Sequence, residues 1–352
     1  MEKRPEVVNF LKAINFQRPE RIPAVVSLLP ATWLRYQKEL EKLVLKYPEL
    51  FPHYQPGNYL KLTLPRHYRK GRWQDVWKVT WEGLCDGLAN APVESLAPLR
   101  DWDTFDTFVV PDPLAYNWYG EKQDWQQIAR SLKQAKAQGY LASGGLPHGF
   151  MYMRLYYLRG FTNFMVDIAT HEPRLEKLIS VVTQYNVTLV EKWLSLGVEI
   201  MNFGDDLGLQ KSLPISPDDW RRYLKPSFQS IFQRCRKQQV LVSLHTDGYI
   251  LDIIPDLIEC GVSLLNPQIR PNTLSGIREF CQGRVAIRLD LDRQLFPFSS
   301  PKDIRAHILE GVKTLALPEG GLLLNAECGP DVPLTNIAAI CETLNELKCL
   351  AG

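Results

Sequence analysis

The chain has 352 residues, of which 45% are hydrophobic and 23% charged, and its formal net charge is +2. This length suits one large α/β domain with an N-terminal elaboration, or two modest domains. The balanced charge gives no support for nucleic-acid binding, and no run approaches the roughly 18 apolar residues of a membrane span. The first residues lack the apolar core of a signal peptide, so we expect a cytoplasmic protein acting on a small molecule.

Seven cysteines are scattered along the chain without a CxxC pair. An odd number in a large chain argues against a disulfide framework, and most of them are expected to be buried as small hydrophobic residues. Cys328 is the exception because it ends a predicted strand. The chain has only six histidines, so a histidine at a strand end also stands out.

The N-terminal third mixes regular elements with irregular ones. The pattern predicts a helix over 6–14, a strand over 24–29 and an amphipathic helix over 31–47. Residues 73–90 favour strands that carry Trp73, Trp77 and Trp81, either as hydrophobic packing or as the wall of a pocket. A proline-spaced connector over 92–118 marks the predicted boundary between an N-terminal elaboration (1–118, including the first barrel strand) and the main part of the barrel (119–352).

Strands and helices alternate after this connector. The predicted helices cover 122–138, 150–169 (interrupted near 159–160), 173–196, 217–238, 249–259, 273–281, 301–315 and 335–350. The predicted strands cover 140–145, 261–266 and 285–292, with others ending at Asp205, His245 and Cys328. Alternating βα units with near-continuous apolar strands indicate a parallel sheet covered on both faces. Their number favours an α/β fold of the (β/α)8 TIM barrel type over an open doubly wound sheet.

Polar residues follow the predicted strands at their C-terminal ends, where a parallel barrel carries its active site. They are His148, Asp205, Asp206, His245, Asp247, Asn266, Gln268, Asp290, Asp292, Glu327 and Cys328. Any one of them could serve as a helix cap or a structural hydrogen-bond partner. Folding alone does not require a charge at the end of every strand, so together they indicate a site.

His245 and Asp247 are two residues apart on one strand and therefore share a face. A histidine, a carboxylate and the sulfur of Cys328 at one barrel mouth could hold Zn²⁺ with a position open for substrate. The alternative is acid–base catalysis by His245, with Asp247 orienting it. Arg159 offers a cation for an anionic substrate, or is a surface arginine at a helix break.

Several segments resemble the uroporphyrinogen decarboxylase (URO-D) superfamily. They are Arg18-Pro-Glu-Arg-Ile-Pro23, Asp75-Val-Trp77, Leu158-Arg-Gly-Phe161, Gly204-Asp-Asp-Leu-Gly208, Ile215-Ser-Pro217, Leu244-His-Thr-Asp-Gly248, Asn266-Pro-Gln268 and Asn325-Ala-Glu-Cys-Gly-Pro-Asp-Val-Pro333. The superfamily includes the decarboxylase and zinc-dependent, corrinoid-linked methyltransferases. The resemblance implies the (β/α)8 barrel.

The chain differs from the decarboxylase of this superfamily in two places. The decarboxylase has a pair of arginines and an aspartate after its first strand, and Leu29-Pro-Ala-Thr-Trp-Leu-Arg35 lacks them. Near the last strand, Glu327-Cys-Gly329 replaces a Gly-His-Gly of the decarboxylase. The methyltransferase branch binds zinc through His-x-Cys and a later cysteine. His245 and Cys328 fit that pattern, while Asp247 stands where the middle cysteine would be.

The resemblance therefore implies a metal-dependent methyltransferase that moves a methyl group between a small substrate and a corrinoid (cobalamin) carried by a partner protein. His245, Asp247 and Cys328 are the expected catalytic residues and zinc ligands. The expected substrate-binding residues are His148, Arg159, Asp205, Asp206, Gln268, Asp290 and Glu327. The alternatives are a decarboxylase of uroporphyrinogen or a related acid, and a non-catalytic barrel that binds a tetrapyrrole or corrinoid. The helical exterior allows a homodimer.

Overall fold

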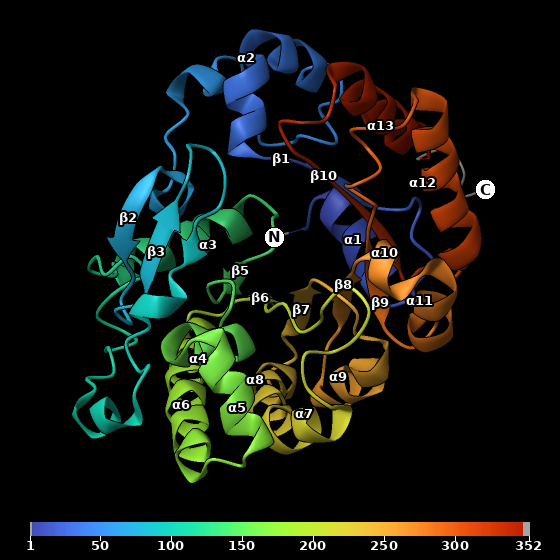
Figure 1. Cartoon of the computed structure of the whole chain (residues 1–352). Helices are drawn as coiled ribbons and strands as arrows, with labels where there is room; N and C mark the ends of the chain where they lie inside the picture. Colours follow the sequence, from blue (N-terminus) through green and yellow to red (C-terminus); the bar gives the residue numbers. More distant parts are fainter. Residues whose placement is uncertain (1, 348–352) are drawn as a thin grey trace. The chain divides into compact units, whose positions relative to one another are not determined.

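The computed structural model describes residues 2–347, which are drawn in colour in Figure 1. They fall into two compact units, of which the first comprises residues 2–8, 72–82 and 91–265, and the second comprises residues 9–71, 83–90 and 266–347. The predicted division at residue 118 falls inside the first unit. None of the helices in the described range is long and apolar enough to cross a membrane.

Three parallel strands, β5 (Ser143–Gly145), β6 (Ile200–Gly204) and β7 (Leu241–Thr246), lie side by side in the first unit. Helices connect them, as expected for parallel neighbours. These are α4 (Tyr152–Arg159), α5 (Phe161–Ala169), α6 (Pro173–Ser195), α7 (Pro217–Tyr223) and α8 (Lys225–Lys237). Helix α6 packs on α4, α8 and β5, so the strands are covered by its apolar face. The unit also contains α3 (Trp125–Ala137), η3 (Glu94–Leu96), η4 (Trp102–Thr107), η5 (Leu251–Ile253) and α9 (Ile254–Cys260).

The pairing register of these strands brings their C-terminal ends to one edge. Met201 of β6 lies opposite Gly144 of β5 and Val242 of β7, and Gly204 lies opposite His245. The residues that follow the strands therefore meet at this edge.

The tryptophan-rich segment forms β2 (Gly71–Gln74), which contains Trp73, and β3 (Thr80–Gly83), which contains Trp81, followed by β4 (Ala91–Pro92). Trp77 lies in the turn between β2 and β3 and not in a strand as predicted. Trp73, Trp77 and Trp81 are at most 6% exposed, and the rings of Trp73 and Trp81 stack with centroids 5.9 Å apart. The Nε1 atoms of Trp81 and Trp118 donate to Asp75 at 3.1 and 3.2 Å. These contacts support the packing interpretation of the tryptophans rather than a pocket wall.

Helix α1 (Pro5–Ile14) passes from the first unit into the second, and β8 (Leu264–Pro267) does so again later in the chain. In the second unit β10 (Leu322–Cys328) lies between β1 (Ala24–Leu28) and β9 (Ala286–Asp290), all parallel. The helices of this unit are α2 (Pro30–Val44), η1 (Asn58–Lys61), η2 (Arg66–Tyr68), α10 (Ile269–Asn272), α11 (Leu274–Cys281), α12 (Pro301–Leu315) and α13 (Leu334–Glu346). Ser300 and Asp303 form a capping box at the start of α12.

Two differences from the predicted helices have local causes. The helix expected over 217–238 is split at Leu224 into α7 and α8, because Pro226 lacks the N–H that would continue the first helix. The last helix was expected to reach residue 350, and its final residues lie outside the described range. The break expected near Arg159 is present, with Gly160 at φ 80° between α4 and α5.

Candidate metal centre

His148 stands on the loop after β5, at the C-terminal edge of the first unit's strands. The amide of Gly149 donates to the carbonyl of Gly204 at 2.7 Å, which holds this loop against the end of β6. A Cβ at position 204 would lie only 2.5 Å from Nδ1 of His148. The glycine is therefore the reason that the imidazole can lie over this strand end.

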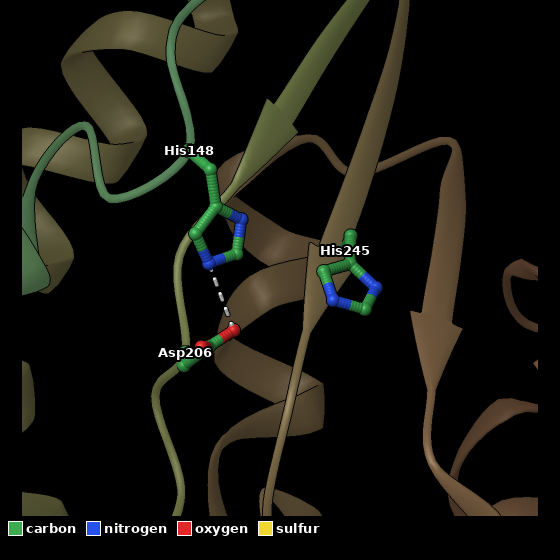
Figure 2. Close-up of side chains that lie close together, drawn as sticks. All are labelled: His148, Asp206 and His245. Atoms are coloured by element: carbon green, nitrogen blue, oxygen red, sulfur yellow. Dashed lines mark ion pairs between the residues drawn. The ribbon is translucent and has the colours of Figure 1, made fainter. Parts of the chain in front are cut away.

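Asp206 and His245 complete a three-residue cluster with His148 (Figure 2). Nε2 of His148 lies 3.2 Å from Oδ1 of Asp206, and the two imidazole centroids are 5.8 Å apart. One potential ligand atom from each of the three residues lies within 4.8 Å of the others. The side chains are 29–46% exposed, so a solute can reach them.

The charges of the cluster reinforce one another. Burial lowers the pKa of His148, but the hydrogen bond and negative charge of Asp206 outweigh it, so the pKa is raised overall. Burial alone would raise the pKa of Asp206. The hydrogen bond to His148 and the charges of both histidines have the larger effect, so the pKa of Asp206 lies below its usual value. The amide of Asp247 also donates to Oδ1 of Asp206 at 3.2 Å. In the absence of a metal ion, His148 and Asp206 therefore favour an imidazolium–carboxylate pair.

Asp247 contacts His245 rather than standing apart as an independent ligand. Its Oδ1 lies 3.2 Å from Nε2 of His245. A carboxylate in this position fixes the orientation and tautomer of an imidazole, as it commonly does for histidines that bind metals. This contact fits an orienting role for Asp247 toward His245.

Asp205 has a structural role in place of the predicted substrate contact. It is fully buried and accepts hydrogen bonds from the amides of Met151, Tyr152 and Met153 at 3.2, 2.6 and 2.9 Å. It thus caps the start of α4, where the helix dipole also favours a carboxylate. Burial raises the pKa of Asp205 to about 7, against the opposing effect of these amides. A buried side chain with both oxygens engaged is not placed to bind substrate.

Arg159 is likewise a structural residue. Its side chain is 4% exposed, donates to Asp167 at 2.7 Å and also donates to the carbonyls of Leu99 and Arg100. The guanidinium lies 4.0 Å from the ring centroid of Trp102. The predicted contact with an anionic substrate is not supported, because these partners enclose the cation.

Tyr156 was not among the predicted site residues. It is half-buried on α4, and burial raises the pKa of its hydroxyl. Tyr157 and the negative charges of Asp205 and Asp206 raise this pKa further. The phenol is therefore neutral and close enough to the two carboxylates to sense their charge. Its position on α4, one turn after the residues whose amides Asp205 accepts from, places it near the site. The sequence alone does not show this, because it does not reveal that Asp205 caps this helix.

Cys328 ends β10 in the second unit, where the structure places it on the buried face. Burial raises the pKa of its thiol, with a further contribution from Cys341 of α13. Asn325 and Glu327 are half-buried, whereas Ala326 and Cys328 are fully buried. Because side chains alternate along a strand, the thiol faces the helix layer of its unit. This placement does not support the predicted role as a zinc ligand.

The other predicted substrate-binding residues are also in the second unit. Glu327 pairs with Arg293 at 2.5 Å and lies in a cavity of about 1020 Å³, with Leu29, Leu295 and Phe298 among its lining residues. Asp290 is 5% exposed and accepts from Nδ2 of Asn325 at 2.7 Å. Gln268 is half-buried and pairs with Asp290 through an isolated β-bridge. Glu327 is therefore placed at a cavity of the second unit.

The donor set of the cluster fits a zinc ion. Catalytic zinc sites commonly use three protein ligands from histidine and carboxylate, with a fourth position for water or substrate. Ligand bonds of about 2.0–2.2 Å keep two ligands on one ion within roughly 4.4 Å of each other. The observed separations of up to 4.8 Å need only small side-chain rotations to meet this limit. His148, Asp206 and His245 would hold the ion.

Replacing Gly204 with alanine is expected to displace His148, because the new methyl group would overlap Nδ1. We expect a loss of about 10- to 100-fold in zinc affinity, as seen when supporting groups around metal ligands are removed. Competition with a chromophoric zinc chelator measures the affinity. Unchanged affinity in a folded G204A variant would show that His148 does not bind the ion.

The family model described as uroporphyrinogen decarboxylase (URO-D) matches residues 98–347. The chain belongs to this family. No curated protein sequence matches the chain. Membership agrees with the recognition from motifs, and it identifies the fold as a TIM barrel, as predicted.

Two solved structures that resemble this chain are a methyltransferase and a methionine synthase. A methyltransferase from Methanosarcina mazei aligns with 97% of this chain and 98% of its own at 16% identity, with a TM-score of 0.65. A B12-independent methionine synthase from Shewanella sp. W3-18-1 aligns with 65% of this chain and 67% of its own at 10% identity, with a TM-score of 0.42. At 16% identity the first comparison shows a common fold.

Proposed function

We propose that this URO-D family protein is a zinc-dependent methyltransferase that moves a methyl group between a small substrate and a corrinoid carried by a partner protein in the cytoplasm. The observation that carries the proposal is the convergence of His148, Asp206 and His245 at the C-terminal strand edge of the first unit. The fold shared with a methyltransferase and the family membership support it.

A bound zinc ion would supply a Lewis acid that favours loss of the proton from a substrate thiol or hydroxyl. Around it, Asp247 would keep His245 oriented through their 3.2 Å contact. Asp206 contributes one negative charge to the ligand set, whereas two neutral imidazoles contribute none. Tyr156, which is half-buried and neutral, would offer a hydroxyl near the acceptor.

A corrinoid on the partner protein would supply the methyl group and would keep the bonding electron pair on its cobalt. The acceptor sulfur or oxygen would form the new bond to the methyl carbon, and its proton would go to solvent or a nearby base. This chemistry needs an acceptor held close to a protein-bound corrinoid, which is why a corrinoid protein is the proposed partner.

The test uses zinc-loaded protein with methylcobalamin in place of the corrinoid protein and a panel of thiols and alcohols, under anaerobic conditions. Formation of cob(I)alamin that is lost in the D206N variant supports the proposal. Full zinc occupancy without demethylation by any acceptor would count against methyl transfer. Conversion of uroporphyrinogen in the same preparation would instead indicate the decarboxylase.

The structure gives less support to uroporphyrinogen as substrate. A substrate with many carboxylates needs several free cations. The arginines in the segments compared with the family above include Arg18, Arg21, Arg35 and Arg159. Arg159 is enclosed by Asp167 and two carbonyls. Arg21 pairs with Glu49, and Arg35 donates to the carbonyl of Pro330. Three of the four arginines are thus engaged with the protein itself.

A further inference from the structure

Arg288 is a charged residue in the middle of β9, a strand that is otherwise buried. The neighbouring residues Ala286, Ile287, Leu289 and Asp290 are at most 5% exposed, whereas Arg288 is half-buried. Leu323 of β10 lies opposite it and is 3% exposed. Burial lowers the pKa of Arg288, which reflects the loss of water around its guanidinium.

No described residue of the second unit hydrogen-bonds or ion-pairs with this guanidinium; the backbone carbonyl of Arg288, in contrast, accepts from Asn266 at 2.7 Å. The nearest carboxylate along the strand, Asp290, accepts from Asn325. Two other arginines of this unit have acidic partners: Arg270 pairs with Asp292, and Arg293 with Glu327.

The chain otherwise neutralises its buried arginines. Arg154 is 4% exposed and pairs with Asp75 at 2.6 Å, and Arg159 pairs with Asp167 at 2.7 Å. Leaving a partly desolvated cation without a counter-charge is unfavourable for folding. An unfavourable group at the centre of a strand is typical of a residue retained for binding rather than for stability.

We propose that Arg288 is the anchor for the carboxylate of a small-molecule ligand. A guanidinium offers parallel N–H donors that match the two oxygens of a carboxylate. Asp290 lies two residues after Arg288 and therefore on the same face of β9. On the neighbouring strand β10, Asn325 and Glu327 share the face of Leu323, which lies opposite Arg288. One cation among these acidic groups suits a monoanion, since a phosphate dianion would be repelled by the carboxylates.

The apolar surroundings define the rest of the ligand. Val25, which lies opposite Asn325 on β1, is 47% exposed. A carboxylate joined to a short aliphatic or aromatic group would place its charge on Arg288 and its apolar part toward Val25. The site uses residues of the second unit alone, and it does not depend on the metal centre or on methyl transfer.

The test is thermal unfolding of the full chain with acetate, propionate or benzoate, against chloride at constant ionic strength. A ligand that binds the folded state raises Tm with its concentration, and we expect a rise of about 2–4 °C for the best carboxylate. The R288Q variant should show no such rise, and its Tm without ligand should equal or exceed that of the unmutated protein. R288K, which keeps the charge but not the paired donors, should show a smaller rise.

The control is R305Q, which removes an exposed arginine paired with Glu346 on the helical surface. It should respond to carboxylates as the unmutated protein does. The proposal is overturned if no carboxylate raises Tm, if R288Q responds equally, or if phosphate stabilises more strongly than every carboxylate. A Tm of R288Q and R288K several degrees lower without ligand would assign Arg288 a structural role instead.

Discussion

Replacing His148 with alanine is expected to lower zinc affinity by more than about 100-fold and to abolish methyl transfer. Removing a group that only orients a metal ligand lowers metal affinity by about 10–100-fold. Removing a ligand itself should therefore lower the affinity further. The pairing of His148 with Asp206 at 3.2 Å and its position beside His245 are the basis for this expectation. Zinc content after dialysis against a chelator, measured beside the unfolding curve, separates loss of the ligand from loss of the fold.

The matched variant is Cys328→Ala. The motif comparison predicts that this cysteine is a ligand, whereas its burial on β10 beside Cys341 predicts that zinc remains bound. We therefore expect C328A to keep its zinc while H148A loses it. The reverse result, with zinc lost from C328A and retained by H148A, would restore the ligand set inferred from the family pattern.

Replacing Asp75 with asparagine is expected to destabilise the folded chain by about 3–5 kcal/mol, the usual cost of removing one partner of a buried ion pair. Asp75 and Arg154 are 0% and 4% exposed and lie 2.6 Å apart. The same carboxylate accepts from the amides of Trp77 and Val79 and from two tryptophan side chains. Without its charge, Arg154 is left as an uncompensated cation in the core.

Denaturant unfolding followed by tryptophan fluorescence measures this effect, since Trp73, Trp81 and Trp118 cluster around the carboxylate. The control is Glu82→Gln, which breaks the ion pair between Arg72 and Glu82. The side chain of Arg72 is 62% exposed and that of Glu82 is 39% exposed. Exposed pairs contribute about 0–1 kcal/mol, so E82Q should unfold almost as the unmutated protein does. Equal effects of D75N and E82Q would mean that the Asp75–Arg154 pair does not stabilise the core.

The sequence was sufficient for most of the fold because the relevant signals are local. The apolar run before His245, the Ser216-Pro217 helix start and the glycine after Arg159 each define an element through nearby residues. The split at Leu224 was missed because the predicted helix continues its amphipathic pattern on both sides of Pro226. The boundaries were predicted less accurately than the elements.

The candidate site was predicted in part. His148, Asp206 and His245 were all named from their positions after strands, with His148 and Asp206 assigned to the substrate, and the structure brings the three side chains together. Their pairing depends on a loop held against β6 by Gly149 and on the absence of a side chain at Gly204, neither of which a motif describes. The capping role of Asp205 depends on three amides more than 50 residues away in sequence.

X-ray absorption at the zinc edge of the metal-loaded protein distinguishes the two possible ligand sets. Zinc held by His148, Asp206 and His245 would have nitrogen and oxygen neighbours at about 2.0–2.2 Å and no sulfur. We expect such a shell, with its histidine contribution reduced in H148A. A sulfur neighbour at about 2.3 Å, or no stoichiometric zinc in the protein, would contradict it.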